Sequence, residues 1–169
     1  MAIENVMIET DQVVNFAVCC TIDMTVQAIN QFLARVQKKE LQESAVNILT
    51  LVHSLELQLW GPTKELRGND TVLQSPFTGC TYFRVHQLLQ DMKKATESKL
   101  DTNWFLVLDE NSEQSSTAVI VRVEDGDVRS GRVAYPVASR YLSAASIAHP
   151  SLEEMIEIAD WKHGGIIQD

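Results

Sequence analysis

Three side chains near the middle of the chain have the chemistry of a candidate catalytic group: His86, Tyr82 and Asp109. A neutral imidazole titrates near physiological pH, so His86 could act as a general base. Because His86 follows Tyr82 by one turn of a predicted helix, both side chains can face the same way. Asp109 ends an apolar predicted strand, where α/β sheets often place functional carboxylates. The alternatives are a histidine on a helix rim and an ordinary loop aspartate.

A second group of residues could bind an anion. Arg122 and Arg132 each occur in a valine-rich predicted strand, and the two strands form one predicted hairpin. If both arginines face the same side, with Tyr135 or Tyr141 nearby, they could hold a carboxylate or phosphate by bidentate hydrogen bonds. Alternatively, each arginine pairs with acidic residues on a solvent-facing sheet, where such pairs stabilise little.

Several aromatic side chains lie near predicted loops or helix ends. They could line an apolar pocket or a partner surface, or they could simply close the core. They are Trp60, Phe77, Trp104 and Trp161.

The sequence has no motif for a metal or a cofactor. Its cysteines, Cys19, Cys20 and Cys80, lack metal-ligand spacing and form a poor disulfide framework. The four histidines are widely separated, and neither a glycine-rich phosphate loop nor a nucleophile elbow is present. We therefore expect no metal and no cofactor.

The charge balance narrows the class of partner. The 169 residues include 14 Lys and Arg against 23 Asp and Glu, for a net charge of −9. Nucleic acid is not expected, because phosphate binding needs a basic surface. No apolar stretch has the length of a membrane span, and the N-terminus is acidic where a secretory signal would be basic. We expect a soluble, cytoplasmic protein whose partner is a protein or a small apolar or anionic molecule, and a homo-oligomer is compatible with these features.

The length of 169 residues predicts one domain over residues 1–169. Apolar runs and alternation indicate strands, and a repeat of three to four residues indicates helices. A capping box at Ser151 and Glu154 starts the last helix, and Asp23 is the expected cap of the first. The expected strands are 13–20, 104–108, 117–123 and 130–137, and residues 3–9 fit either an edge strand or an N-terminal arm. The expected helices are 24–39, 82–97, 138–147 and one after Pro150.

Two segments are harder to interpret. Residues 44–60 fit either a helix or strands, and their β-branched content favours strands. Residues 61–81 are rich in proline and glycine, which predicts a long surface loop.

The C-terminal half also carries motifs of turn and apolar residues: Pro76-Phe77-Thr78-Gly79, Val85 to Leu89, Phe105 to Asp109, Arg132-Val133 to Pro136, Leu142, and Glu153-Glu154 with Gly164-Gly165. With these motifs, the C-terminal half to two-thirds of the chain resembles a family of small acidic bacterial and fungal proteins known only as a domain of unknown function. That family has asparagines near the positions of Tyr141 and Ser146, where this chain has none. The resemblance implies no activity, because the family itself suggests none.

Together these features predict an α/β (α+β) fold, with a central mixed sheet of about four to six strands and helices packed on it. The leading functional hypothesis is a binding or protein-interaction module, since no acid–base pair, nucleophile motif or metal set emerges from any spacing. The alternative is a cofactor-independent isomerase, cyclase or lyase acting on an apolar metabolite in a pocket lined by Arg, Tyr and His. Such an enzyme leaves almost no sequence signature, so the sequence leaves both hypotheses open.

Overall fold

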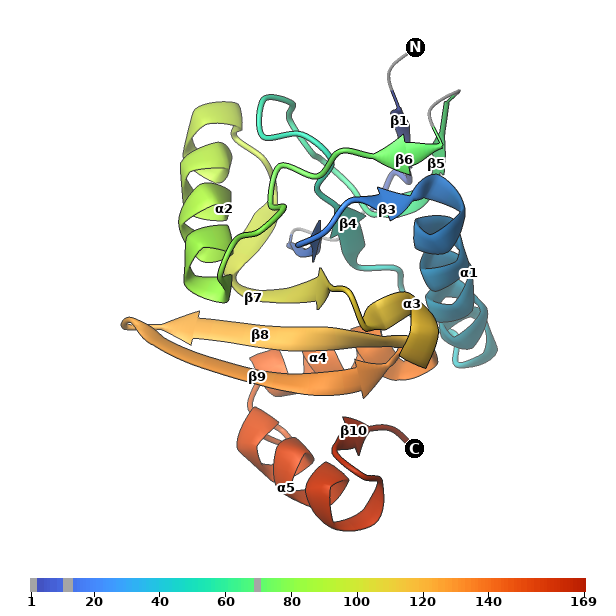
Figure 1. The fold of residues 1–169 in the computed structure, drawn as a ribbon, viewed down its shortest axis with the longest axis vertical. Helices are drawn as coiled ribbons and strands as arrows, with labels where there is room; N and C mark the ends of the chain where they lie inside the picture. Colours follow the sequence, from blue (N-terminus) through green and yellow to red (C-terminus); the bar gives the residue numbers. More distant parts are fainter. Residues whose placement is uncertain (1–2, 11–13, 69–70) are drawn as a thin grey trace.

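A six-stranded mixed sheet forms the centre of the fold (Figure 1). The computed structural model describes residues 3–10, 14–68 and 71–169. The sheet confirms the predicted fold class, a mixed α/β domain with helices on the sheet. From one edge to the other its strands are β10 (Ile166–Ile167), β9 (Asp127–Ala134), β8 (Thr117–Glu124), β7 (Leu100–Leu108), β2 (Asn15–Cys20) and β4 (Leu49–Leu51).

The central strand β7 is covered on both faces. Residues 105–108 are completely buried, as their unbroken apolar run predicts. On one side β7 pairs in parallel with β2, which pairs in parallel with β4. On its other side β7 pairs antiparallel with β8, which forms the expected hairpin with β9. The carboxyl ends of β2, β4 and β7 therefore lie at one edge of the sheet.

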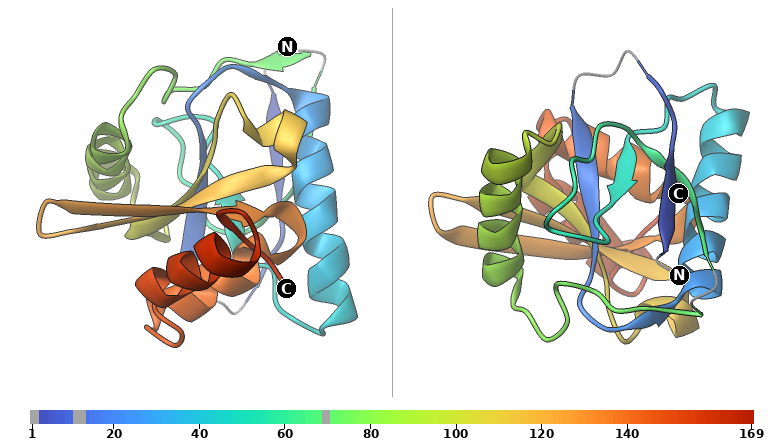
Figure 2. Two further views of the ribbon diagram at one scale, coloured as in Figure 1. Left: turned by 60° about the horizontal axis from the view of Figure 1, so that its bottom comes forward. Right: turned by 90° about the horizontal axis from the view of Figure 1, so that it is seen from above.

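Helices cover the two faces of the sheet and create two separate cores. Successive residues of β7 alternate between them: Leu106 and Leu108 belong to one core, Phe105 and Val107 to the other. Figure 2 shows the helix at residues 82–96 on one side of the β8–β9 hairpin and the last helix on the other. The helices are α1 (Val26–Gln42), α2 (Tyr82–Thr96), α3 (Ser112–Ser115), α4 (Ala138–Ser146) and α5 (Leu152–Lys162), with a 3-10 turn, η1 (Tyr135–Val137).

The helix ends are partly as predicted. The capping box of α5 is present, with Ser151 and Glu154 each bonding the other's backbone. The prediction that Asp23 caps the first helix is wrong: Thr25 accepts from the Ala28 amide at 3.1 Å. The reason is a two-residue strand, β3 (Met24–Thr25), which delays the start of the helix.

The stretch 61–81 is more ordered than the predicted long loop. It contains β5 (Thr63–Arg67), which pairs antiparallel with β1 (Glu4–Met7), and β6 (Val72–Leu73), which pairs with β3. These partners are distant in sequence, so proline and glycine content alone could not reveal the pairing.

Only a short part of 44–60 is a strand. β4 has three residues, and at the edge of the sheet it is joined to the segment after it by two side-chain hydrogen bonds. The Thr63 hydroxyl accepts from the Leu51 amide at 2.9 Å, and the Thr50 hydroxyl donates to the Gly61 carbonyl at 2.8 Å. These bonds satisfy backbone groups at the edge of the sheet, so no further strand is needed there.

Gly61 lies where the chain passes closely under the N-terminal segment. A Cβ atom at this position would lie 2.4 Å from the Ile8 carbonyl oxygen, which is backbone and has little room to move. We expect Gly61→Ala to lower the free energy of unfolding by about 1–3 kcal/mol, as overpacking does. Urea denaturation measures this change, with the exposed Glu56→Ala of the same loop as control. Equal midpoints for the two variants would contradict the close approach.

Candidate functional site

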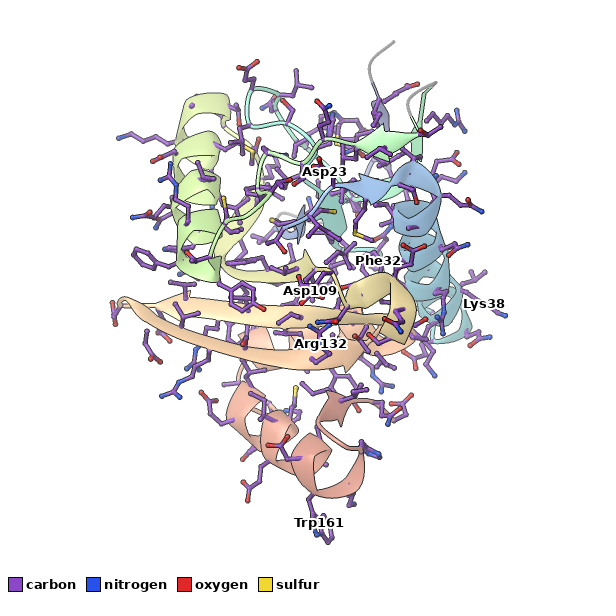
Figure 3. The ribbon with its side chains drawn as sticks, viewed as in Figure 1. Asp23, Phe32, Lys38, Asp109, Arg132 and Trp161 are labelled. Atoms are coloured by element: carbon purple, nitrogen blue, oxygen red, sulfur yellow. The ribbon has the colours of Figure 1, made fainter. Side chains whose placement is uncertain are left out.

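A polar cluster forms where β7 ends, on the face of the sheet that carries α2. Asp109, the first residue after β7, lies beside Arg132 of β9 (Figure 3). Arg132 donates from Nη2 to Oδ2 at 2.5 Å and from Nη1 to Oδ1 at 3.3 Å. Nη1 also donates to the hydroxyl of Thr117 on β8 at 3.0 Å. The two-pronged contact therefore joins β7 to β9 across the intervening strand.

The turn after β7 is built on the same carboxylate. Its Oδ1 accepts from the Asn111 amide and from the Ser112 hydroxyl, each at 3.1 Å. The Asp109 amide in turn donates to the Ser112 hydroxyl at 2.8 Å. Burial raises the pKa of Asp109, but the hydrogen bonds and charge of Arg132, with the other donors, outweigh it, so the net pKa is lowered.

This cluster is better suited to holding the fold than to catalysis. Asp109 is ionised at neutral pH and both its oxygens are engaged, so it is a poor general base. Tyr82, at the start of α2, lies close enough that the Asp109 charge adds to burial in raising the pKa of the phenol. Among the described residues the Tyr82 hydroxyl has no hydrogen-bond partner, so it is the group of this cluster that remains available to a ligand.

His86 does not join this cluster. Its Nδ1 lies 2.7 Å from the Thr102 carbonyl, which can only accept, so Nδ1 carries the proton. The bond fastens α2 to the first part of β7, whereas Asp109 follows the last residue of that strand. The predicted group of His86, Tyr82 and Asp109 is thus divided between the two ends of β7.

The two predicted arginines do not converge. In the register of the hairpin, Arg132 is opposite Val119, three residues before Arg122 on β8, so the two side chains point to opposite faces. Arg122 instead contacts Glu153 of α5 at 2.8 Å, and its guanidinium lies 5.9 Å from the ring centre of Trp104. Arg132 therefore ties β9 to the end of β7, whereas Arg122 attaches α5 to the sheet.

The two predicted tyrosines are also apart. Tyr135 is buried edge-on against Phe32, with 4.9 Å between ring centres, and burial, followed by the Cys20 thiol, raises its pKa to about 12. Its hydroxyl is buried without a hydrogen-bond partner among the described residues. Tyr141 points toward the C-terminus, with its hydroxyl 3.4 Å from the Gln168 carbonyl.

His53, for which the sequence predicts no specific role, borders a cleft at the carboxyl end of β4. The Asn5 amide nitrogen donates to the Leu51 carbonyl at 2.8 Å and lies 3.3 Å from His53 Nδ1. Since that nitrogen can only donate, Nδ1 accepts and the neutral ring carries its proton on Nε2. Burial lowers the pKa of His53, although the Leu51 carbonyl opposes this. The cleft has a volume of about 570 Å³ and uncharged walls among the described residues: Ile3, His53, Ser54, Leu57, Thr71, Val72, Leu73 and Gln74.

The outer surface of α5 is the most exposed apolar feature near the C-terminus. Trp161 is 80% exposed and points away from the body of the protein (Figure 3), and Ile158, one turn earlier, is 48% exposed. A small groove of about 160 Å³ runs along α5 beside Ile158. The sequence indicated Trp161 as a possible partner contact, but Ile158 could not be told from a core residue of an amphipathic helix. The groove is lined by Tyr141, Pro150, Met155, Ile158, Ala159, His163, Ile167 and Gln168.

Comparison with models of protein families, with curated proteins and with solved structures finds no match to this chain. The resemblance to a domain of unknown function therefore stays a prediction. Within the described residues no group of three or more His, Cys, Asp or Glu side chains is placed to hold a metal ion. No helix in the described part of the chain is both long enough and apolar enough to cross a membrane.

Removing Arg132 should destabilise the protein because it leaves the Asp109 carboxylate, 8% exposed, without its cation. We expect Arg132→Met to lower the free energy of unfolding by about 3 kcal/mol, in the range for broken buried pairs. Arg129→Met is the matched control on the same strand, because Arg129 pairs with Asp127 in solvent. That variant should lose no more than about 1 kcal/mol.

The same pair predicts a pH dependence. Because the folded-state pKa of Asp109 is lowered from 3.8, the stability that it contributes is present above about pH 3.8 and is lost as the pH falls through the lower folded value. The difference in stability between the wild type and Arg132→Met should therefore be largest near neutral pH and shrink in acid. Urea titrations at several pH values measure it, and a difference that does not change with pH would show that the pair is not the cause.

Proposed function

We propose that this protein is a protein-interaction module that binds a basic, amphipathic segment of a partner through the outer surface of α5. The observation that carries the proposal is Trp161, four-fifths exposed on an ordered helix. Tryptophan is enriched among the residues that dominate binding energy at protein interfaces. Ile158, one turn earlier on the same helix, adds a second exposed apolar side chain.

The charge of α5 indicates the chemistry of the partner. The helix carries four acidic residues and one basic residue, Lys162. Glu153 is held by Arg122, and Glu154 and Glu157 stand exposed beside Ile158. An acidic border around an apolar centre favours a partner with lysine or arginine around its own apolar contact. The same charge disfavours association of two copies through this helix.

The enzyme alternative has less support. It requires a pocket where arginine, tyrosine and histidine meet, yet Arg122 and Arg132 point to opposite faces of the sheet. The Asp109 carboxylate already accepts hydrogen bonds from Arg132 and the turn after β7, and His86 Nδ1 is hydrogen-bonded to the Thr102 carbonyl. Asp109 and His86 are thus used to hold elements of the fold together, and Tyr82 is the one candidate catalytic group whose polar atom has no hydrogen-bond partner among the described residues.

The test is site-specific photocrosslinking in the native cells. A photoreactive phenylalanine analogue replaces Trp161 in one variant and Phe83, which is 42% exposed on α2, in the control. We expect a partner crosslinked only from position 161, through a segment rich in lysine or arginine. The same product from both positions, or none from position 161, would contradict the proposal.

Affinity measurements with that partner then test the residue itself. Trp161→Ser should weaken binding about 30-fold, the loss of a 2 kcal/mol hot spot. Phe83→Ser should leave the affinity unchanged. Unchanged binding by Trp161→Ser would overturn the assignment of this surface.

A further inference from the structure

Glu40 is a carboxyl group that the fold buries without a cation among the described residues. Glu40 follows Val36 on the apolar stripe of α1 and is only 6% exposed. Its Oε1 accepts from the Ser139 hydroxyl of α4 at 2.8 Å. Among the described residues it forms no ion pair, and burial raises its pKa to about 7 although the Ser139 bond opposes this. An ionised carboxylate in such a place is unfavourable unless a cation joins it.

The neighbouring cations are already neutralised. Lys39 and Arg140 both contact Glu43, at 3.2 and 3.1 Å, and both contact Asp169, with Lys39 at 3.4 Å. These two cations and two carboxylates form a closed network of no net charge. Glu40 is therefore the one carboxyl group at this place for which the described residues supply no counter-charge.

A cavity of about 380 Å³ lies between α1 and α4 at Glu40. Among the described residues the second oxygen, Oε2, has no hydrogen-bond partner, and it is not sealed from solvent. The volume is within the usual range for small-molecule sites. Lys39, Glu43 and Arg140 of the neutral network line part of the wall. Small and apolar side chains supply the rest, together with Ser143: Ala45, Val46, Ile48, Pro136 and Ala144.

We propose that this cavity binds a primary alkylammonium group. The ammonium supplies the missing partner of Glu40, and the alkyl chain lies against the apolar wall. An ammonium fits better than a guanidinium, because Ser139 already occupies Oε1 and leaves one oxygen rather than a two-pronged acceptor. The further donors of the ammonium can reach the Ser143 hydroxyl at the cavity wall.

Calorimetric titration of the whole protein with n-butylammonium chloride tests the proposal. We expect saturable binding to the wild type and none with 1-butanol, which has the same alkyl chain and no charge. Glu40→Gln should weaken binding at least about tenfold, since it removes the charge but keeps an acceptor for Ser139. Glu157→Gln removes the same charge on α5 and should bind as the wild type does.

Equal binding by Glu40→Gln, or no saturable binding to the wild type, would overturn the proposal. Near-ultraviolet circular dichroism shows whether Glu40→Gln retains the native packing, and that variant removes a buried ionisable group without removing volume. A parallel titration with Nα-acetyl-lysine N-methylamide distinguishes a free amine from a partner's lysine: tighter binding than that of butylammonium indicates a protein source. Trp161→Ser should bind butylammonium normally, so failure here and failure of the α5 interface are separable.

Discussion

The burial of β7 on both faces is the constraint on which the rest of the structure depends. Residues 105–108 expose nothing, so layers must cover both sides of the sheet. α2 covers one side, and α1, α4 and α5 cover the other (Figure 2). Because alternate side chains of β7 pack into the two cores, the loss of either helix layer would expose apolar surface at the centre of the sheet.

The polar groups close to β7 serve mainly to hold those layers. Arg132 binds Asp109 on one face, where it closes the turn after β7. On the other face Arg122 binds Glu153 and so attaches α5. A pair of strand arginines that looks like an anion site in the sequence is thus two separate clamps. Their opposite directions follow from the hairpin register, which places Arg132 opposite Val119, an odd number of positions (three) before Arg122 on β8.

The groups to which we assign binding are Trp161 and Glu40. Trp161 lies outside both cores, and Glu40, which accepts from Ser139, has no cation among the described residues. Both had a signal in the sequence. Trp161 stands near the end of a predicted helix, and Glu40 stands four residues after Val36, on a helical stripe otherwise made of apolar residues. A charged residue on such a stripe is worth testing as a site whenever no opposite charge is available to it.

The sequence by itself determined the strongly periodic elements: α1, α2 and α5, the apolar second half of β7 (residues 104–108) and the β8–β9 hairpin. Their signals are local, because the repeat of apolar residues that indicates a helix or a strand is complete within about ten residues. Only the tertiary structure decided the short strands β4, β6 and β10, which are too short to show alternation, and the pairing of β1 with β5. It also decided that Asp109 meets Arg132 rather than His86. Which face a strand residue occupies, and what lies opposite it, depends on the register between segments far apart in the chain.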